Sequence, residues 1–151
     1  HFFSAIDEVL VHLLRNAVDH GIESPAVRIS SGKSETGSVV LEIGVNEEQV
    51  TIRLSDDGAG IDRRRLVEQA VKEGVLSPSV AGDLSAEQVL NLVLEGGIST
   101  ASEISEISGR GVGMAAARKC VDELGGRLSI SSRQGEGTQV LIQLPGKYSA
   151  A

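Results

Sequence analysis

Two pairs of alternating segments, one on each side of a group of helical segments, constrain the fold of this chain most strongly. Residues 38–45 (SVVLEIGV) and 49–55 (QVTIRLS) alternate between apolar and polar side chains, and the NEE between them predicts a short hairpin connection. Residues 127–132 (RLSISS) and 138–144 (TQVLIQL) form the second pair, joined by RQGEG. The chain is therefore expected to form an antiparallel-rich sheet with helices packed on one face, an α+β fold.

Apolar residues at helical spacing predict four helices. They cover residues from about 6 to 20, 63–74, 85–97 and about 112–124. Gly21 follows the first helix as a stop, and Ser85 and Gln88 have capping-box spacing at the start of the third. Residues 95–111 are rich in Gly, Ser and Thr and lack an apolar period, which predicts a loop.

Composition limits the class of protein. A chain of 151 residues with two Phe, one Tyr and no Trp predicts one domain with an aliphatic core. The formal charge of −7 argues against a general nucleic-acid or acidic-membrane surface, but a phosphate ligand remains compatible with it. Cys120 is the only cysteine, so an intrachain disulfide is excluded and a buried thiol is expected. With no membrane-length apolar run and no leader pattern, an intracellular location is expected.

The segment HLLRNAVDHG (12–21) places short polar side chains on one stripe of the first helix. At about 100° per residue, Asn16 lies about 40° from His12 and Asp19 about 20° to the other side, roughly opposite the apolar arc of Leu10 and Leu14. The Asn oxygen is a hard ligand that suits Mg²⁺, and His12 could orient or deprotonate a nucleophile beside the metal. An ordinary polar helix face explains the same residues equally well.

The segment SDDGAGID (55–62) places Asp56 where a strand ends and the chain must turn. Gly58 and Gly60 permit a positive φ or a close approach of a flat ligand to the main chain. An Asp at this point can accept a hydrogen bond from an exocyclic amine such as that of adenine. Asx-turn chemistry is the alternative, and for this segment taken alone it is the favoured one.

The segment SGRGVGM (108–114) places Gly109, Gly111 and Gly113 before the fourth helix. Successive glycine N–H groups can point at a phosphate, and the helix N-terminus adds about half a positive charge. A dinucleotide-binding motif is excluded, because the glycines do not follow a strand and the third comes one residue early. SGKS (31–34) is not a P-loop, because Val27 stands where its first glycine is required.

Five separated motifs in order, HLLRNAVDHGIE, DDGAGID, GIST, SGRGVGM and GEGTQVLIQLP, carry a family resemblance. The chain resembles the ATP-binding catalytic domain of histidine kinases, and the form of the first motif indicates the chemotaxis (CheA-type) branch. The resemblance extends from about residue 8 to Pro145 within a single domain over residues 1–151. It implies a two-layer α/β sandwich with a mixed, mostly antiparallel sheet, the Bergerat ATP-binding fold that is shared with gyrase, Hsp90 and MutL.

The resemblance implies roles for particular residues. Asn16 matches the Mg²⁺-binding Asn, Asp56 matches the adenine-reading Asp, and His12 stands where related ATPases carry a general-base Glu. Residues 95–113 correspond to an ATP lid, whose closure over the nucleotide would exclude water and favour transfer over hydrolysis. The other implied nucleotide-binding residues are Arg15, Asp19, His20, Gly58, Gly60, Ile61, Ser99, Thr100, Gly109, Arg110, Gly111, Val112, Gly113, Met114 and Thr138.

Three residues depart from the pattern of the family. Ala59 stands where an Arg is frequent, Ile98 replaces an aromatic residue of the lid, and Ala115 replaces an acidic residue. None of them removes a group expected to bind Mg²⁺ or adenine, so we expect ATP binding to be retained. The rate of catalysis is the property that these changes put in question.

The implied activity is transfer of the γ-phosphoryl group of Mg-ATP to a histidine. The acceptor histidine is expected on a separate phosphotransfer domain, because His12 and His20 are implied to belong to the nucleotide site. A response regulator downstream, a homodimer formed through a domain absent here and a cytoplasmic location are also implied. Neither nucleic-acid binding nor membrane insertion is expected. Two alternatives remain: a non-catalytic ATP-sensing module, and a serine kinase or ATPase on the same fold.

Overall fold

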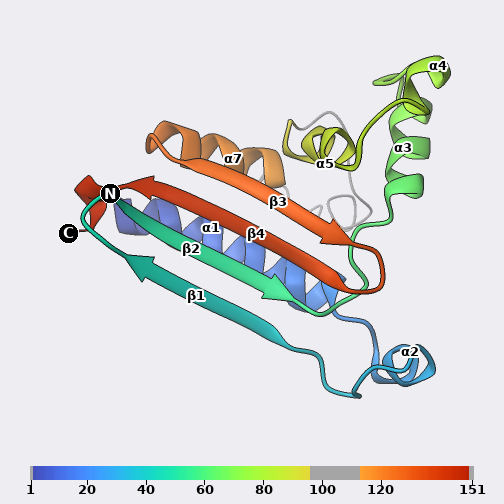
Figure 1. The fold of residues 1–151 in the computed structure, drawn as a ribbon, viewed down its shortest axis with the longest axis horizontal. Coiled ribbons are helices and arrows are strands. Elements are labelled where there is room, and N and C mark those ends of the chain that lie inside the picture. Colours follow the sequence, from blue (N-terminus) through green and yellow to red (C-terminus); the bar gives the residue numbers. More distant parts are fainter. Residues whose placement is uncertain (1, 96–112, 150–151) are drawn as a thin grey trace.

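Four strands form one antiparallel sheet in the computed structural model, which describes residues 2–95 and 113–149. Its order is β1-β2-β4-β3, with the bounds β1 Val39–Val45, β2 Gln49–Asp56, β3 Arg127–Arg133 and β4 Gly137–Pro145 (Figure 1). Each predicted pair of alternating segments is a hairpin, and β2 and β4 join the two hairpins at the centre of the sheet. In this register Asp56 is the partner of Thr138.

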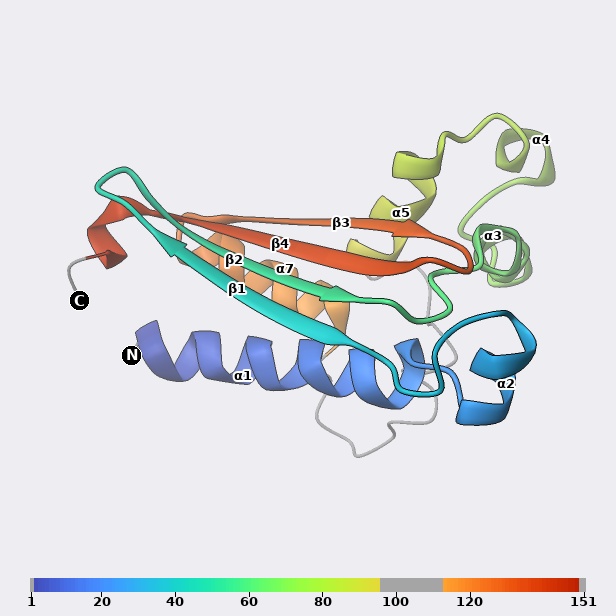
Figure 2. The ribbon, with the colours of Figure 1, turned by 60° about the horizontal axis from the view of Figure 1, so that its bottom comes forward.

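Helices precede, separate and follow the two hairpins. Their bounds are α1 Phe2–Asn16, the π-helical turn η1 Ala17–Gly21, α2 Pro25–Ser30, α3 Arg63–Lys72, α4 Pro78–Ala81, α5 Ala86–Leu94, α7 Met114–Glu123 and the 3₁₀ turn η2 Gly146–Tyr148. Figure 2 shows α1 and α7 on the same side of the sheet, so the predicted two-layer α+β architecture is confirmed. Within the described ranges, no helix has the length and apolar character needed to cross a membrane.

The core lies between one face of the sheet and the helices. Aliphatic side chains dominate it, as the shortage of aromatic residues predicted, and the two large rings of Phe2 and Tyr148 stack on each other at its margin. The most deeply buried members, at 0–1% exposure, are Ala70, Val89, Ala117, Val121 and Ile142. Burial of such side chains is the main favourable term in folding, at about 25 cal/mol per Å² of apolar surface.

Local hydrogen bonds explain where several helices begin. Ser85 and Gln88 form the predicted capping box, with Ser85 N–H donating to Gln88 Oε1 at 2.8 Å and Gln88 N–H to Ser85 Oγ at 3.2 Å. The helices α2 and α4 were not predicted. Each begins at a Ser-Pro pair, in which the serine is the N-cap residue and the proline, with its fixed φ, is the first helical residue.

The end of α1 differs from the regular helix that the sequence predicted. The chain is α-helical as far as Asn16 and then forms a π-helical turn, closed by a 2.9 Å hydrogen bond from Ile22 N–H to Ala17 O. A π turn inserts an extra residue into the helical spacing, and it often occurs at functional sites. Gly21 ends the turn, as expected of the predicted stop, and Asp19 lies on it.

The strand β1 lies at the edge of the sheet and is poorly covered. Val40, Leu41, Ile43 and Val45 are 48%, 41%, 60% and 60% exposed, whereas alternate residues of β2 are buried. Figure 2 shows why, because the helical layer does not extend over the whole of β1. An apolar edge strand that is open to solvent is uncommon, since it can pair with another chain.

Candidate functional site

His12 and Asn16 lie together on the last two turns of α1. The Nδ2 atom of Asn16 is 3.1 Å from His12 Nε2 and 3.9 Å from the sulfur of Met114, the first residue of α7. His12 is only 7% exposed, and Asn16 is half-buried. The structure therefore places these two residues side by side, and α7 contributes a third side chain to the same place.

The predicted position of this stripe was wrong in one respect. We expected His12 and Asn16 roughly opposite the apolar side of the helix, but they lie at the border of the core-facing surface. Around the helix, Val9 and Leu13 lie between this pair and the central apolar arc. Their side chains are buried, at 2% and 3% exposure. Arg15, by contrast, is exposed on α1, as are Asp19 and His20 on the π turn.

Asp56 ends β2 with its side chain turned back onto its own turn. Its Oδ1 accepts a 2.9 Å hydrogen bond from Gly58 N–H, and the main chain of Thr138 on β4 also stabilises the carboxylate. Burial nevertheless raises the pKa of Asp56 above its ordinary value, and the nearby negative charges of Asp57 and Glu23 act in the same direction. A half-buried carboxylate held by main-chain N–H groups is a suitable acceptor for a polar ligand group.

The glycines of this turn allow main chains to approach closely. A Cβ atom on Gly58 would collide with the carbonyl of Gly21, and one on Gly60, which has φ +70°, would collide with the carbonyl of Arg133. Between the two glycines, Ala59 N–H donates to Gly21 O at 2.8 Å. This bond joins the end of the π turn directly to the turn that carries Asp56.

Ser132, a residue that was not predicted, holds Thr138 and Ile61 beside this turn. Ser132 Oγ on β3 accepts a 2.7 Å hydrogen bond from Ile61 N–H and lies 3.0 Å from Thr138 Oγ1. The only sequence signal for Ser132 is its place opposite Thr138 in the second hairpin. The structure thus brings together Asp56, Gly58, Gly60, Ile61 and Thr138.

A second group that was not predicted surrounds Asp57. Arg28, the most buried charged residue at 1% exposure, and Lys33 bond to Glu23 and to the main chain of the Asp57–Gly58 turn. Lys33 is the lysine of the SGKS segment, which is not a P-loop. Its hydrogen bonds give it a structural role instead. A buried arginine cannot be recognised from periodicity, because charged residues are normally exposed.

Part of the predicted phosphate-binding segment lies outside the described residues. These positions are Ile98, Ser99, Thr100, Gly109, Arg110, Gly111 and Val112. Gly113 is described and is the N-cap residue of α7, followed by Met114 against Asn16. The described end of this segment is therefore adjacent to the His12–Asn16 pair.

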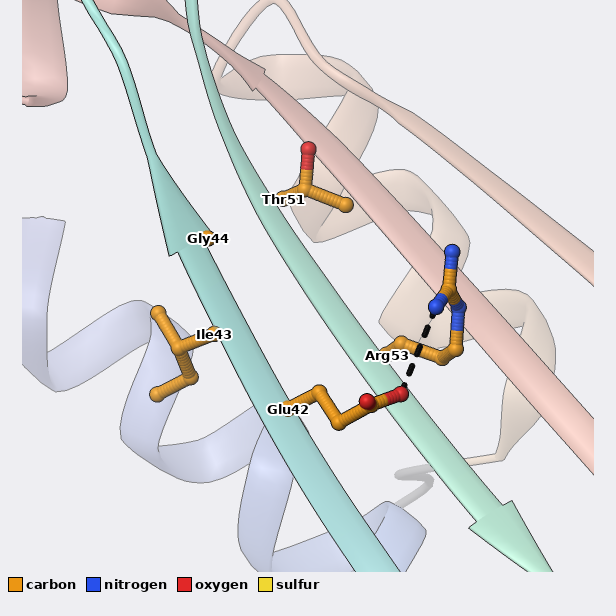
Figure 3. Close-up of a pocket in the computed structure, with 5 residues that line it drawn as sticks. All are labelled: Glu42, Ile43, Gly44, Thr51 and Arg53. Carbon is orange, nitrogen blue, oxygen red and sulfur yellow. Dashed lines mark hydrogen bonds and ion pairs between the residues drawn. The ribbon is translucent and has the colours of Figure 1, made fainter.

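A pocket among the described residues lies away from this site. A shallow depression of about 330 Å³ lies over β1 and β2, lined by Glu42, Ile43, Gly44, Thr51 and Arg53 (Figure 3). A 3.3 Å ion pair between Arg53 and Glu42 crosses it, and it contains none of the predicted nucleotide residues. Among the residues that the structure describes, no group of three or more His, Cys, Asp or Glu could hold a metal ion.

Sequence comparison with known proteins gives a consistent result. A profile of the family described as histidine kinase-, DNA gyrase B-, and HSP90-like ATPase matches residues 4–148. The chemotaxis protein CheA of Bacillus subtilis (strain 168) is 43% identical over 145 residues, which are 94% of this chain and 22% of that protein. The chemotaxis protein CheA of Halobacterium salinarum is 44% identical over 140 residues, 93% of this chain and 21% of that protein.

A relative that is not named as a chemotaxis protein also matches this chain. The gliding motility regulatory protein of Myxococcus xanthus is 40% identical over 140 residues, 93% of this chain and 18% of that protein. The chain thus spans about a fifth of the length of these relatives. Among solved structures, the histidine kinase domain from Erythrobacter litoralis EL346 blue-light activated histidine kinase has a TM-score of 0.53 at 20% identity, covering 96% of this chain and 45% of that one. This likeness supports the fold.

Proposed function

Because the chain belongs to the histidine kinase-, DNA gyrase B-, and HSP90-like ATPase family, we propose that it is the ATP-binding catalytic domain of a chemotaxis-type histidine kinase. In this proposal it transfers the γ-phosphoryl group of Mg-ATP to a histidine of a separate phosphotransfer domain. One observation carries the proposal: the Asp56 turn and the His12–Asn16 pair belong to one framework, joined by the hydrogen bond from Ala59 N–H to Gly21 O.

The Asp56 turn is the proposed site of the adenine base. The half-buried carboxylate would accept a hydrogen bond from the exocyclic amine, and Gly58 and Gly60 leave room for a flat ring next to the main chain. Thr138, fixed against Ser132 and paired with Asp56 across the sheet, would support the same edge of the base. Ile61 would contribute apolar surface, since its main chain is already held by Ser132.

The His12–Asn16 pair is the proposed phosphate side. Asn16 would hold Mg²⁺ through its side-chain oxygen, because a neutral amide oxygen is a hard ligand that this ion accepts. Bound there, Mg²⁺ would neutralise charge on the phosphate oxygens. His12 would orient Asn16 through their 3.1 Å contact or accept a proton, a role worth roughly 10²–10⁴-fold in rate.

Further residues complete the proposed nucleotide site. Arg15, Asp19 and His20 are exposed near the end of α1, where they can reach phosphate groups or their water shell. Residues 95–113 would act as the lid, with Ser99, Thr100, Gly109, Arg110, Gly111 and Val112 over the phosphates and with Gly113 and Met114 as its C-terminal end. Closure of such a lid would exclude water and favour transfer to the acceptor over hydrolysis.

The proposed partners are those that a chemotaxis-type histidine kinase would need. A phosphotransfer domain would supply the acceptor histidine, a response regulator would receive the phosphoryl group, and another region of the parent protein would form a homodimer. The expected location is the cytoplasm.

The test combines the chain with Mg²⁺, γ-labelled ATP and a phosphotransfer domain from a chemotaxis kinase. The expected product is an acid-labile, base-stable phosphohistidine on the acceptor. ATP binding without any phosphorylated acceptor would instead indicate a sensing module. An acid-stable product would indicate a serine kinase, and free phosphate without an acceptor would indicate an ATPase.

Asn16→Ala tests the metal role directly. The variant should lose the part of the ATP affinity that depends on magnesium, about tenfold or more, because a chain oxygen no longer holds the ion. Isothermal titration with ATP, in magnesium and again in a chelator, measures that part for each protein. An equal magnesium dependence in the variant and the wild type would remove Asn16 from the metal site.

A further inference from the structure

Arg28 fixes the segment after α2 to the Asp56 turn. Its guanidinium donates through Nε to Ser34 O at 2.7 Å and through one terminal nitrogen to Thr36 O at 3.4 Å, which holds the loop. Its remaining bonds reach Glu23 Oε1 at 3.2 Å, Asp57 O at 3.2 Å and Asp57 Oδ2 at 2.9 Å. The planar fork of an arginine suits such a set of fixed acceptors.

Lys33 approaches the same turn from the other end of this segment. Its ammonium donates to Glu23 Oε2 at 2.7 Å, to Asp57 O at 2.9 Å and to Gly58 O at 2.8 Å. The three donors of the ammonium group therefore all have acceptors. Two of those acceptors are main-chain carbonyls directly after Asp56.

Two carboxylates balance the two cations. The hydrogen bond from Lys33 holds the pKa of Glu23 below its usual value, and the Ser38 N–H together with Arg28 does the same for Asp57. Both acids are thus ionised at neutral pH. Burial of the Arg28 charge has a desolvation cost that offsets much of the attraction within this group, so the network is better explained by a role in fixing geometry than by net stabilisation.

A single peptide unit connects this network to Asp56. The carbonyl of Asp57, which accepts from both Arg28 and Lys33, belongs to the same planar unit as the N–H of Gly58. That N–H donates to Asp56 Oδ1 at 2.9 Å. The cations therefore orient the donor that orients the carboxylate, and hydrogen bonds in such a chain strengthen one another.

We propose that Lys33 and Arg28 are positioning residues for base selection: they lock the Asp57–Gly58 peptide so that the Asp56 carboxylate is held ready for an exocyclic amine of a purine. This inference rests on the proposed function, because it assumes that Asp56 reads the base. It adds residues that contact neither the base nor the phosphates. Without the hydrogen bonds from Lys33 and Arg28, the Asp56 side chain can rotate, and the site loses its preference for a base with an exocyclic amine.

The test compares ATP with inosine triphosphate, in which an oxygen replaces the exocyclic amine. The wild type should prefer ATP by about tenfold or more, because one buried hydrogen bond is lost with inosine. Lys33→Met keeps most of the side-chain volume and removes all three donors. It should reduce the ratio of the two dissociation constants about fivefold, mainly by weakening ATP, with little change for inosine triphosphate.

A matched variant separates positioning from general damage. Lys72→Met removes an exposed lysine on α3 and should leave the ratio unchanged. Thermal unfolding of each protein checks that it is folded, and Lys33→Gln takes the place of Lys33→Met if the latter does not fold.

The outcomes distinguish this inference from the proposed function. A wild type that binds ATP weakly, or no better than inosine triphosphate, contradicts the assigned base site and with it this inference. A wild type that prefers ATP, with a variant that keeps the preference within twofold, overturns the positioning role alone. Equal loss of both nucleotides in the Lys33 variant also overturns it, since that result indicates general damage or a phosphate contact.

Discussion

Asp56 is subject to two opposing physical effects. Burial and the neighbouring negative charges of Asp57 and Glu23 disfavour its ionised form, while the N–H of Gly58 and the main chain of Thr138 favour it. Burial has the larger effect, so the pKa is raised in the folded state. A carboxylate whose ionised form has a higher free energy in the folded protein than in the unfolded chain lowers the free energy of unfolding. Such a cost is typical of residues retained for binding.

Asp56→Asn should therefore stabilise the chain while abolishing its ATP preference. Above the raised pKa, folded Asp56 is ionised at a cost that the amide avoids; below the ordinary pKa of 3.8, both states are protonated and the cost is absent. We expect the variant to unfold roughly 1–3 °C higher at pH 7, with the gain lost as pH falls through the folded pKa of Asp56. Scanning calorimetry from pH 4 to 8 measures it, and a gain that persists at the acidic end would contradict this origin.

Single residues also show what a sequence can predict about a site. Asp56 and Asn16 could be selected because a carboxylate at a strand end and an amide on a helix have recognisable chemistry. The burial of His12 could not, since it depends on how α1 rolls against the sheet and α7. Arg28 was missed for the same reason, because its acceptors are main-chain carbonyls that only the folded loop brings together.

The end of α1 and the end of β2 are held together by backbone contact. Gly21 O accepts from Ala59 N–H at 2.8 Å, and this approach is possible only because Gly58 has no side chain. The π turn delivers the carbonyl to that place, since an extra residue before Gly21 shifts the helix end. A side chain at position 58 would thus act on two elements at once.

Gly58→Ala should separate these two elements. Its Cβ would collide with the Gly21 carbonyl, and we expect a loss of stability of about 2–4 kcal/mol together with weaker ATP binding. Gly82→Ala is the matched control, because no atom lies within 4 Å of its added Cβ and its φ is −74°. Chemical denaturation of both variants gives the comparison. Equal stability in the two would mean that the main chains can separate without cost.

The elements that periodicity predicted differ in kind from those that it missed. Both hairpins and the helices α1, α3, α5 and α7 are long enough to show an apolar pattern. The helices α2 and α4 are too short to show one, and only their Ser-Pro starts indicated a helix. A π turn leaves no periodic trace in five residues, so the helix appeared regular as far as Gly21.

At the scale of the whole molecule, the sheet of the described residues has an open edge at β1. Ser38 O accepts from Asp57 N–H and Asn46 N–H donates to Gln49 O, so the even-numbered positions of β1 bond to β2. The main-chain groups of the odd-numbered positions, including Ile43, therefore point outward. Among the described strands only β2 pairs with β1, and the exposed apolar side chains along its other edge predict pairing with a second copy of the chain.

Ile43→Lys should weaken this self-association without unfolding the chain. A lysine on an edge strand opposes pairing, and Ile43 is already 60% exposed, so little buried surface is lost. Val27→Lys, at 52% exposure on α2, is the control. Sedimentation velocity over a concentration series should show at least about a fivefold weaker association for Ile43→Lys alone. A wild type that stays monomeric throughout, or equal shifts in both variants, would contradict a role for β1.

The groups proposed to hold the base and the phosphates stand on different elements, one on the strand turn and the other on the first helix, and a main-chain hydrogen bond connects those elements. Protein engineers could exploit that separation by remodelling the strand turn for a synthetic cosubstrate while leaving the reactive end untouched. Under the proposed function, a domain altered in this way would label only its own products in a mixture of kinases, so the division between the two elements offers a way to trace one signalling route.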